Sequence, residues 1–135
     1  MTTKIFVNLA VKDLDRSKAF LIGLALRSTR NSPIRLPACM VIADDIYAML
    51  LTHPKFKEFT KKDIVDAHSA TEVLTCLSFD SKEEVNKIVD TAVAAGGTEV
   101  REPQDYGFMY GRSFNDLDGH IWEIIWMDPS DTQRT

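Results

Sequence analysis

The sequence has few cysteines, glycines and prolines, and it lacks any long hydrophobic run. Its two cysteines, Cys39 and Cys76, lie in separate apolar segments without the spacing of a zinc knuckle or a Cys-x-x-Cys pair, so we expect buried, reduced thiols. The 6 glycines and 5 prolines exclude a collagen-like or low-complexity chain. No stretch approaches the roughly 18 apolar residues of a membrane helix, and the N-terminus has no basic leader with an apolar core. We therefore expect a cytoplasmic protein that does not bind membranes.

The sequence also has no excess of basic residues. Its 16 Lys and Arg are outnumbered by 20 Asp and Glu, which gives a net charge of -4. That balance opposes binding to a polyphosphate, so we expect no nucleic-acid partner. Residues 55–62 do interleave Phe56 and Phe59 with lysines, which is compatible with a nucleic-acid patch or with a solvated linker. The net negative charge of the chain favours the solvated linker over a nucleic-acid patch. A length of 135 residues with 44% hydrophobic residues predicts a single domain, 1–135, with its own core.

The first half of the chain changes its hydrophobic period once. Aliphatic residues alternate from Ile5 to Val11, which predicts a half-buried strand, and helical spacing then runs from Asp13 to Gly23. Three short β-rich segments follow, separated by prolines and an acidic pair. These segments are residues 27–34, 38–43 and 46–52.

The second half repeats this order. A β-rich run from Val73 to Phe79 precedes Ser81 and Glu84, which form a capping box at a helix start, and Gly96 and Gly97 end the helix. Three further strands are predicted at residues 99–101, 110–114 and 120–127, with a turn at 116–119. A shift of 68 positions superimposes the halves. The chain is therefore predicted to contain two βαβββ modules, 1–53 and 72–128, and a linker, 54–71, with a helical turn or two.

The tandem modules, together with RSFNDLDGHIWEIIW near the end, resemble the vicinal oxygen chelate superfamily. This family includes glyoxalase I, bleomycin-resistance proteins, fosfomycin-resistance transferases and extradiol dioxygenases. Leu117 stands where many members have proline. The resemblance implies an α+β fold in which the modules form a cup-shaped, mostly antiparallel eight-stranded sheet with helices outside. It also implies a divalent metal inside the cup and assembly as a homodimer.

The family's metal-ligand positions can be compared with this sequence one by one. The first-strand histidine of the family corresponds to Phe6, its counterpart in the second module to Leu74, and the closing-strand ligand of the first module falls near Met49. Only the last ligand is matched, by Glu123. Because a hard or borderline divalent ion needs three or more N/O ligands, we predict no metal site and no cofactor.

Apolar residues in three ligand positions predict a cup that binds a small organic molecule instead. Asn8, two residues after Phe6, offers polar groups on the same strand face. The segment DYGFMYGRSF adds Phe108, Tyr110 and Arg112, either as a core strand with a glycine-rich approach or as a mobile lip that stacks on a flat ligand. The predicted substrate-binding residues are Phe6, Asn8, Met49, Leu74, Phe108, Tyr110 and Arg112. Phe6, Asn8, Leu74 and Glu123 are expected to line one concave surface.

Glu123 is the candidate catalytic residue, because it lies in the apolar run HIWEIIWM, where an unpaired carboxylate is costly. Three roles remain open: a structural ion pair with a neighbour such as Arg112, a general base or ligand contact, and a metal ligand. Trp122 and Trp126 alternate with Glu123, which predicts that they face away from the cup, beneath a helix or at a subunit interface.

Three functions follow from these features. The first is a glyoxalase/bleomycin-resistance-like protein of unassigned substrate that binds a small organic molecule without the usual metal. The second is a metal-dependent glyoxalase-type lyase, isomerase or dioxygenase. The third is a metal-free acid/base enzyme in which Glu123 moves a proton while Asn8 and Tyr110 orient the substrate. The sequence does not decide whether the protein is an enzyme.

Overall fold

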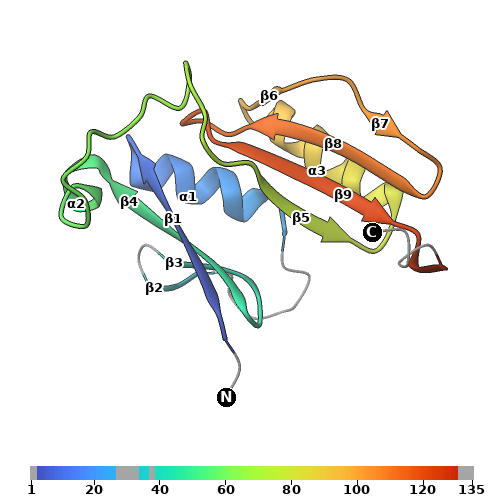
Figure 1. Cartoon of the computed structure of the whole chain (residues 1–135), viewed down its shortest axis with the longest axis horizontal. Helices are drawn as coiled ribbons and strands as arrows, with labels where there is room; N and C mark the ends of the chain where they lie inside the picture. Colours follow the sequence, from blue (N-terminus) through green and yellow to red (C-terminus); the bar gives the residue numbers. More distant parts are fainter. Residues whose placement is uncertain (1–2, 27–33, 37–38, 131–135) are drawn as a thin grey trace. The chain divides into compact units, whose positions relative to one another are not determined.

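A computed structural model describes residues 3–26, 34–36 and 39–130. The chain divides into two compact units, Met1–Asp66 and Ala67–Thr135, so the division falls inside the predicted linker 54–71. Each unit is built around its own sheet, as Figure 1 shows. No helix in the described ranges is long and apolar enough to cross a membrane.

The first unit has a four-stranded sheet with the order β1-β4-β3-β2. β1 and β4 run parallel, and β3 pairs antiparallel with both β4 and β2. A parallel pair needs a crossover, and α1 belongs to that connection. The elements are β1 Ile5–Val11, α1 Leu14–Gly23, β2 Ile34–Leu36, β3 Cys39–Ala43, β4 Ile46–Thr52 and α2 His53–Phe56.

The helix α1 begins at Asp13, whose carboxylate accepts a hydrogen bond from the Arg16 amide at 3.2 Å. Its buried face, which includes Phe20 and Leu21, packs on β4. Ala48 of β4 is fully buried. The alternation predicted for the first strand is not seen in its burial, because Ile5 and Phe6 are both exposed and Ala10 and Val11 are both buried.

The second unit repeats this topology. Its sheet has the order β5-β9-β8-β6, with β7 also paired to β8, and its parallel pair is β5 and β9. The helix α3 lies across one face of the sheet (Figure 1) and packs against β8 and β9. The elements are β5 Thr75–Phe79, α3 Lys82–Ala94, β6 Thr98–Glu99, β7 Gln104–Asp105, β8 Met109–Asn115 and β9 Ile121–Met127.

The helix α3 begins as the capping pattern predicts, because the Ser81 hydroxyl accepts from the Glu84 amide at 3.1 Å. Its apolar face packs on the sheet, where Trp122 and Phe114 are stacked and Trp122 is only 1% exposed. This arrangement confirms that Trp122 lies beneath a helix. The core of the unit comprises Val85, Ile88, Val89, Ala92, Phe114, Trp122 and Ile124.

The turn between β8 and β9 depends on one buried carboxylate. Asp116 Oδ1 accepts from the amides of Asp118 at 2.9 Å and His120 at 3.0 Å, and Oδ2 accepts from the Trp122 indole N–H at 2.9 Å. Gly119 has φ +89°, and a Cβ there would lie 2.7 Å from the Ala67 carbonyl carbon. Only glycine fits both the conformation and the space.

The α+β fold and the two βαβββ repeats are confirmed, but the number of strands is not the eight that we expected. The described residues contain nine strands, in sheets of four and five, because the connection to β8 forms two short strands, β6 and β7. Within the predicted first-module strand at 27–34, residues 27–33 lie outside the described residues. A single cup formed by both sheets stays a prediction.

Candidate functional site

Glu123 lies on β9, which is bordered by β5 on one side and β8 on the other. Because side chains alternate along a strand, Trp122 and Ile124 face α3, whereas Glu123 faces the opposite side of the sheet. We call that opposite side the Glu123 face. Its apolar members, as the strand pairing places them, are Met109, Ile121, Ile125 and Met127.

The strand register aligns three polar side chains across the Glu123 face. Ser113 of β8 is the cross-strand partner of Glu123, and Cys76 of β5 is its partner on the other side. Residues paired in this way point to the same side of a sheet and lie about 4.5–5.5 Å apart between Cα atoms in an antiparallel pair. Ser113, Glu123 and Cys76 therefore form one polar row. Ile121 and Ile125 flank Glu123 along β9, and Asn115 and Ser78 are further polar residues on this face.

The counter-ion of Glu123 is Arg101, not Arg112. Arg101 Nη2 lies 3.3 Å from Glu123 Oε2, with side-chain exposures of 47% and 20%. Arg101 follows β6, and the register places Arg112 on the opposite side of the sheet from Glu123. Of the three roles left open for Glu123, the structure contains an ion pair, but Arg112 is not its partner. The register aligns Ser113 with Glu123, and Arg112, one residue earlier on β8, points to the other face.

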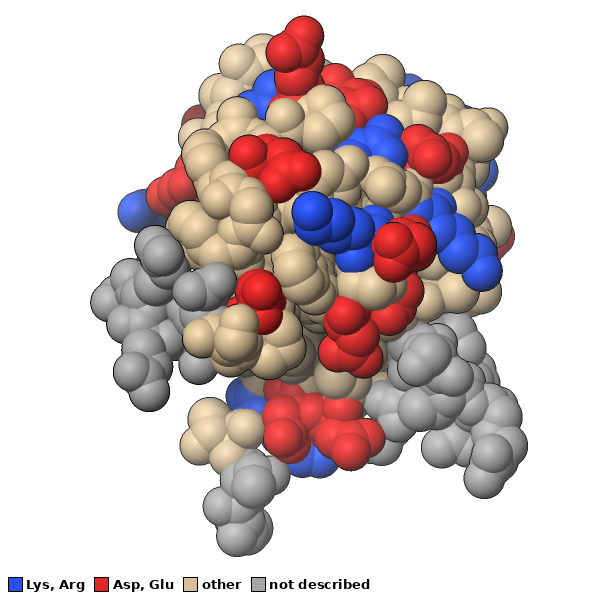
Figure 2. All heavy atoms as spheres, turned by 90° about the vertical axis from the view of Figure 1, so that its right-hand side faces the viewer, with Lys and Arg blue, Asp and Glu red and all other residues tan. Residues whose placement is uncertain are grey.

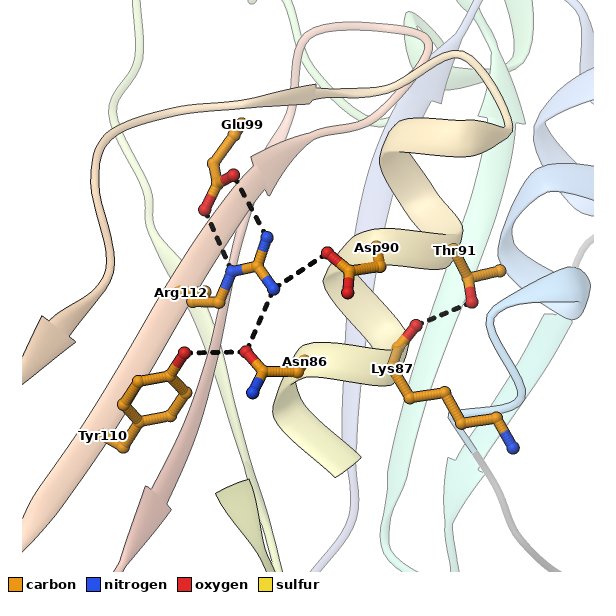
Figure 3. A network of polar contacts seen from close by, with 7 residues as sticks. All are labelled: Asn86, Lys87, Asp90, Thr91, Glu99, Tyr110 and Arg112. Atoms are coloured by element: carbon orange, nitrogen blue, oxygen red, sulfur yellow. Dashed lines mark hydrogen bonds and ion pairs between the residues drawn. The ribbon is translucent and has the colours of Figure 1, made fainter. Parts of the chain in front are cut away.

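Arg112 instead joins the sheet to α3 and β6 (Figure 3). Its Nε and Nη2 donate to the two carboxylate oxygens of Glu99 at 3.0 and 3.1 Å, while Nη1 contacts Asp90 and Asn86, each at 3.0 Å. These hydrogen bonds, that to Glu99 above all, raise the pKa of Arg112. Tyr110 donates to Asn86 Oδ1 at 2.7 Å in the same network.

Tyr110 and Arg112, predicted to bind substrate, thus lie on the α3 face and not with Glu123. Phe108, just before β8, stacks with Tyr106 at 6.3 Å between ring centroids. Of the two readings of this segment, the packing of Tyr110 and Arg112 against α3 agrees with the core strand.

The predicted site residues of the first unit share one face of its sheet. Phe6 is the partner of Tyr47, and Asn8 is the partner of Met49. The Phe6 ring, 49% exposed, stacks on Tyr47 at 4.5 Å, and Asn8 Nδ2 donates to the Phe6 carbonyl at 3.2 Å. Met49 packs on the cluster that contains Tyr47. Leu74 precedes β5 in the second unit and is exposed.

Both cysteines are free, as predicted, but their surroundings differ: Cys39 is buried and Cys76 is exposed. Partial burial of its thiol raises the pKa of Cys76, and the negative charge of Glu123 raises it further. A raised pKa favours the neutral thiol of Cys76 near neutral pH, and the neutral thiol is the less nucleophilic form.

Ser113 is the least satisfied member of the row. Ser113 is 1% exposed, and its hydroxyl is a buried polar atom without a hydrogen-bond partner among the described residues. A buried group of this kind costs about 1–3 kcal/mol. Sequence reasoning missed Ser113, Cys76 and Arg101, and only the pairing of β8 and β5 with β9 identifies the first two.

The donor set does not fit a resident divalent ion of the family type. The described residues contain no group of three or more His, Cys, Asp or Glu side chains that could hold a metal. Phe6, Met49 and Leu74 offer no oxygen or nitrogen, and the Glu123 carboxylate is already paired with Arg101.

Two βαβββ units, each with its first and last strands paired in parallel, define the class of vicinal oxygen chelate proteins. The chain belongs to the Glyoxalase/Bleomycin resistance protein/Dioxygenase superfamily, which matches residues 5–124. None of the curated proteins compared matches the chain.

Solved structures of the same fold cover nearly the whole chain. A hypothetical protein from S. aureus is 27% identical, with 93% of this chain and 95% of that chain covered and a TM-score of 0.73. A glyoxalase/bleomycin resistance protein/dioxygenase family enzyme from Burkholderia phytofirmans PsJN is 19% identical, with 93% and 99% covered and a TM-score of 0.68. The fosfomycin resistance protein FosX from Listeria monocytogenes is 19% identical, with 97% and 98% covered and a TM-score of 0.65.

Proposed function

We propose that this member of the superfamily binds a small organic molecule on the Glu123 face, without the divalent metal typical of the family. The observation that carries the proposal is the polar row of Ser113, Glu123 and Cys76 on a face that also carries the apolar residues Ile121, Ile125 and Met127. A few polar groups surrounded by apolar side chains are typical of small-molecule sites. The binding residues predicted in the first unit, Phe6, Asn8 and Met49, are proposed to contact a ligand on their own sheet, where Asn8 and Met49 are paired. We also propose a cytoplasmic homodimer.

Glu123 is proposed to orient the ligand through its carboxylate, with Arg101 as its counter-ion at 3.3 Å. Tyr110 and Arg112 have no part in this site, because their polar atoms are engaged with Asn86, Asp90 and Glu99 on the α3 face. Family members in which a metal polarises the substrate use donor atoms that Phe6 and Leu74 lack. The proposed function is therefore binding, and the lyase, isomerase or dioxygenase alternatives have no specific observation in their favour.

A thermal-shift screen of small aromatic compounds tests the proposal. We expect a ligand to raise the melting temperature equally with and without a chelator, since a ligand at 100 times its dissociation constant stabilises by about 2.7 kcal/mol. Glu123→Gln should reduce this shift, whereas Glu72→Gln, at an exposed carboxylate of the same unit, should keep it. Stabilisation that requires added metal, or that survives Glu123→Gln unchanged, would contradict the proposal.

The purified protein is expected to hold no stoichiometric Zn, Ni, Fe or Mn at Glu123. One carboxylate leaves most of a coordination shell to water, so any affinity is weak. Elemental analysis should give the same metal content for the natural protein and for Glu123→Gln. One equivalent of metal that survives dialysis against a chelator and is released by Glu123→Gln would restore the metalloenzyme interpretation.

A further inference from the structure

The Arg101 side chain crosses β8 to reach Glu123. The Val100 amide donates to the Ser113 carbonyl at 3.2 Å, so the segment that carries Arg101 runs along one edge of β8. Glu123 lies on β9, across the other edge of β8 and directly opposite Ser113. An ion pair between Arg101 and Glu123 therefore spans β8 at the position of Ser113.

The Ser113 hydroxyl, at the position that the ion pair spans, is buried. An arginine N–H could donate to its oxygen, but the structure gives the Ser113 hydroxyl no hydrogen bond to Arg101 or to any other described group. The hydroxyl is thus enclosed next to a carboxylate, without a partner of its own. A ligand group that replaced the arginine head and also donated to Ser113 would satisfy both side chains.

The two members of the ion pair differ in how easily they can separate. Arg101 is 47% exposed on the segment after β6, whereas Glu123 is 20% exposed on a strand paired at both edges. Exposed arginines return to water at little cost, because surface ion pairs contribute about 0–1 kcal/mol. Glu123 cannot leave the face, so its half-buried carboxylate needs another positive group when Arg101 moves away.

From this geometry we propose that Ser113 and Glu123 form a binding site for a compact organic cation, a primary ammonium group on an apolar body, and that Arg101 is the side chain it displaces. The ammonium donates to the Glu123 carboxylate and to the Ser113 hydroxyl, which lie on paired residues of neighbouring strands. The apolar body rests on Ile125 and Met127 of the same face. An anionic ligand would place like charges side by side, and the net charge of -4 attracts cations.

The inference rests on the proposed function. Three probes that share a benzene ring and differ in their polar group distinguish a failure of the inference from a failure of the proposed function. Benzylamine, benzoate and benzyl alcohol are titrated at low ionic strength into the full-length ¹⁵N-labelled protein, and the amide shifts of Ser113 and Glu123 are followed. We expect saturable shifts with benzylamine alone. Its dissociation constant should fall about tenfold in Arg101→Ala, in which no side chain competes, and should be unchanged in Arg16→Ala, at an exposed arginine of α1.

Two further variants distinguish a ligand contact from a structural role. Ser113→Ala should weaken benzylamine binding several-fold without lowering the melting temperature, because it removes a buried hydroxyl that has no partner in the free protein. Glu123→Gln should abolish benzylamine binding. If Ser113→Ala leaves the dissociation constant unchanged, or Arg101→Ala raises it, the inference is wrong.

The remaining outcomes are equally decisive. If benzoate or benzyl alcohol shifts the same amides more strongly than benzylamine, the Glu123 face binds small molecules as proposed, but the inference of a cation is overturned. If none of the three probes shifts these amides, even in Arg101→Ala, the inference fails and the thermal-shift screen decides the proposed function separately.

Discussion

Replacing Asp116 with alanine should lower the free energy of unfolding by about 3–4 kcal/mol, because it leaves the Asp118 and His120 amides and the Trp122 indole N–H without their acceptor. Asp116→Asn should lower the free energy of unfolding by less, about 1–3 kcal/mol. The one amide oxygen of asparagine can accept either from the two backbone amides or from the indole N–H, and its NH₂ group then lies against the remaining donor. Chemical denaturation monitored by circular dichroism measures both. Wild-type stability of Asp116→Ala would show that the turn does not depend on this carboxylate.

The same carboxylate predicts a dependence of stability on pH. Burial raises the pKa of Asp116, against the opposing effects of the Trp122 indole, the charge of His120 and the two backbone amides. The folded state therefore takes up a proton more readily than the unfolded chain, so stability is gained as the pH falls through this raised pKa. Because Asp116→Asn cannot titrate, the stability difference between wild type and Asp116→Asn should grow from pH 7 to pH 4. A constant difference would contradict the raised pKa.

Replacing Arg112 with methionine should lower the free energy of unfolding by about 2–3 kcal/mol. The side chain is 11% exposed, and its loss leaves Glu99, Asp90 and Asn86 without the donor that joins β8 to β6 and α3 (Figure 3). Arg112→Lys should recover only part of this stability, because one ammonium cannot reproduce the paired hydrogen bonds to Glu99. Urea denaturation of the three proteins measures the series.

Arg101→Met is the matched control for Arg112. Arg101 makes one ion pair with 47% exposure of its side chain, so its loss should cost less than about 1 kcal/mol. Equal losses for Arg101→Met and Arg112→Met would mean that the network around α3 contributes no more than a surface ion pair. Figure 2 shows acidic and basic side chains interspersed on the face it presents. Ion pairs between such exposed side chains are weak, because water screens the two charges.

The Glu123 site could be predicted from the sequence only in part. Alternation along β9 correctly separates Glu123 from Trp122, because it depends on a single strand. The polar neighbours of Glu123 depend on how β8 and β5 align with β9, which no single strand encodes. A shift of one residue in that register would exchange Ser113 for Arg112, which the sequence analysis named as an example of a partner for Glu123.

Local patterns by themselves determined that this protein has two βαβββ repeats and where α1 and α3 begin. These features follow from hydrophobic period, capping residues and residue type, which act over a few neighbours in the chain. Only the tertiary structure decided that Arg101 pairs with Glu123, that Arg112 binds Glu99 and Asp90, and that the Ser113 hydroxyl is buried without a partner. The reason is physical: ion pairs and burial are set by strand register and by connections between strands, and residues distant in sequence meet only when the sheet has formed.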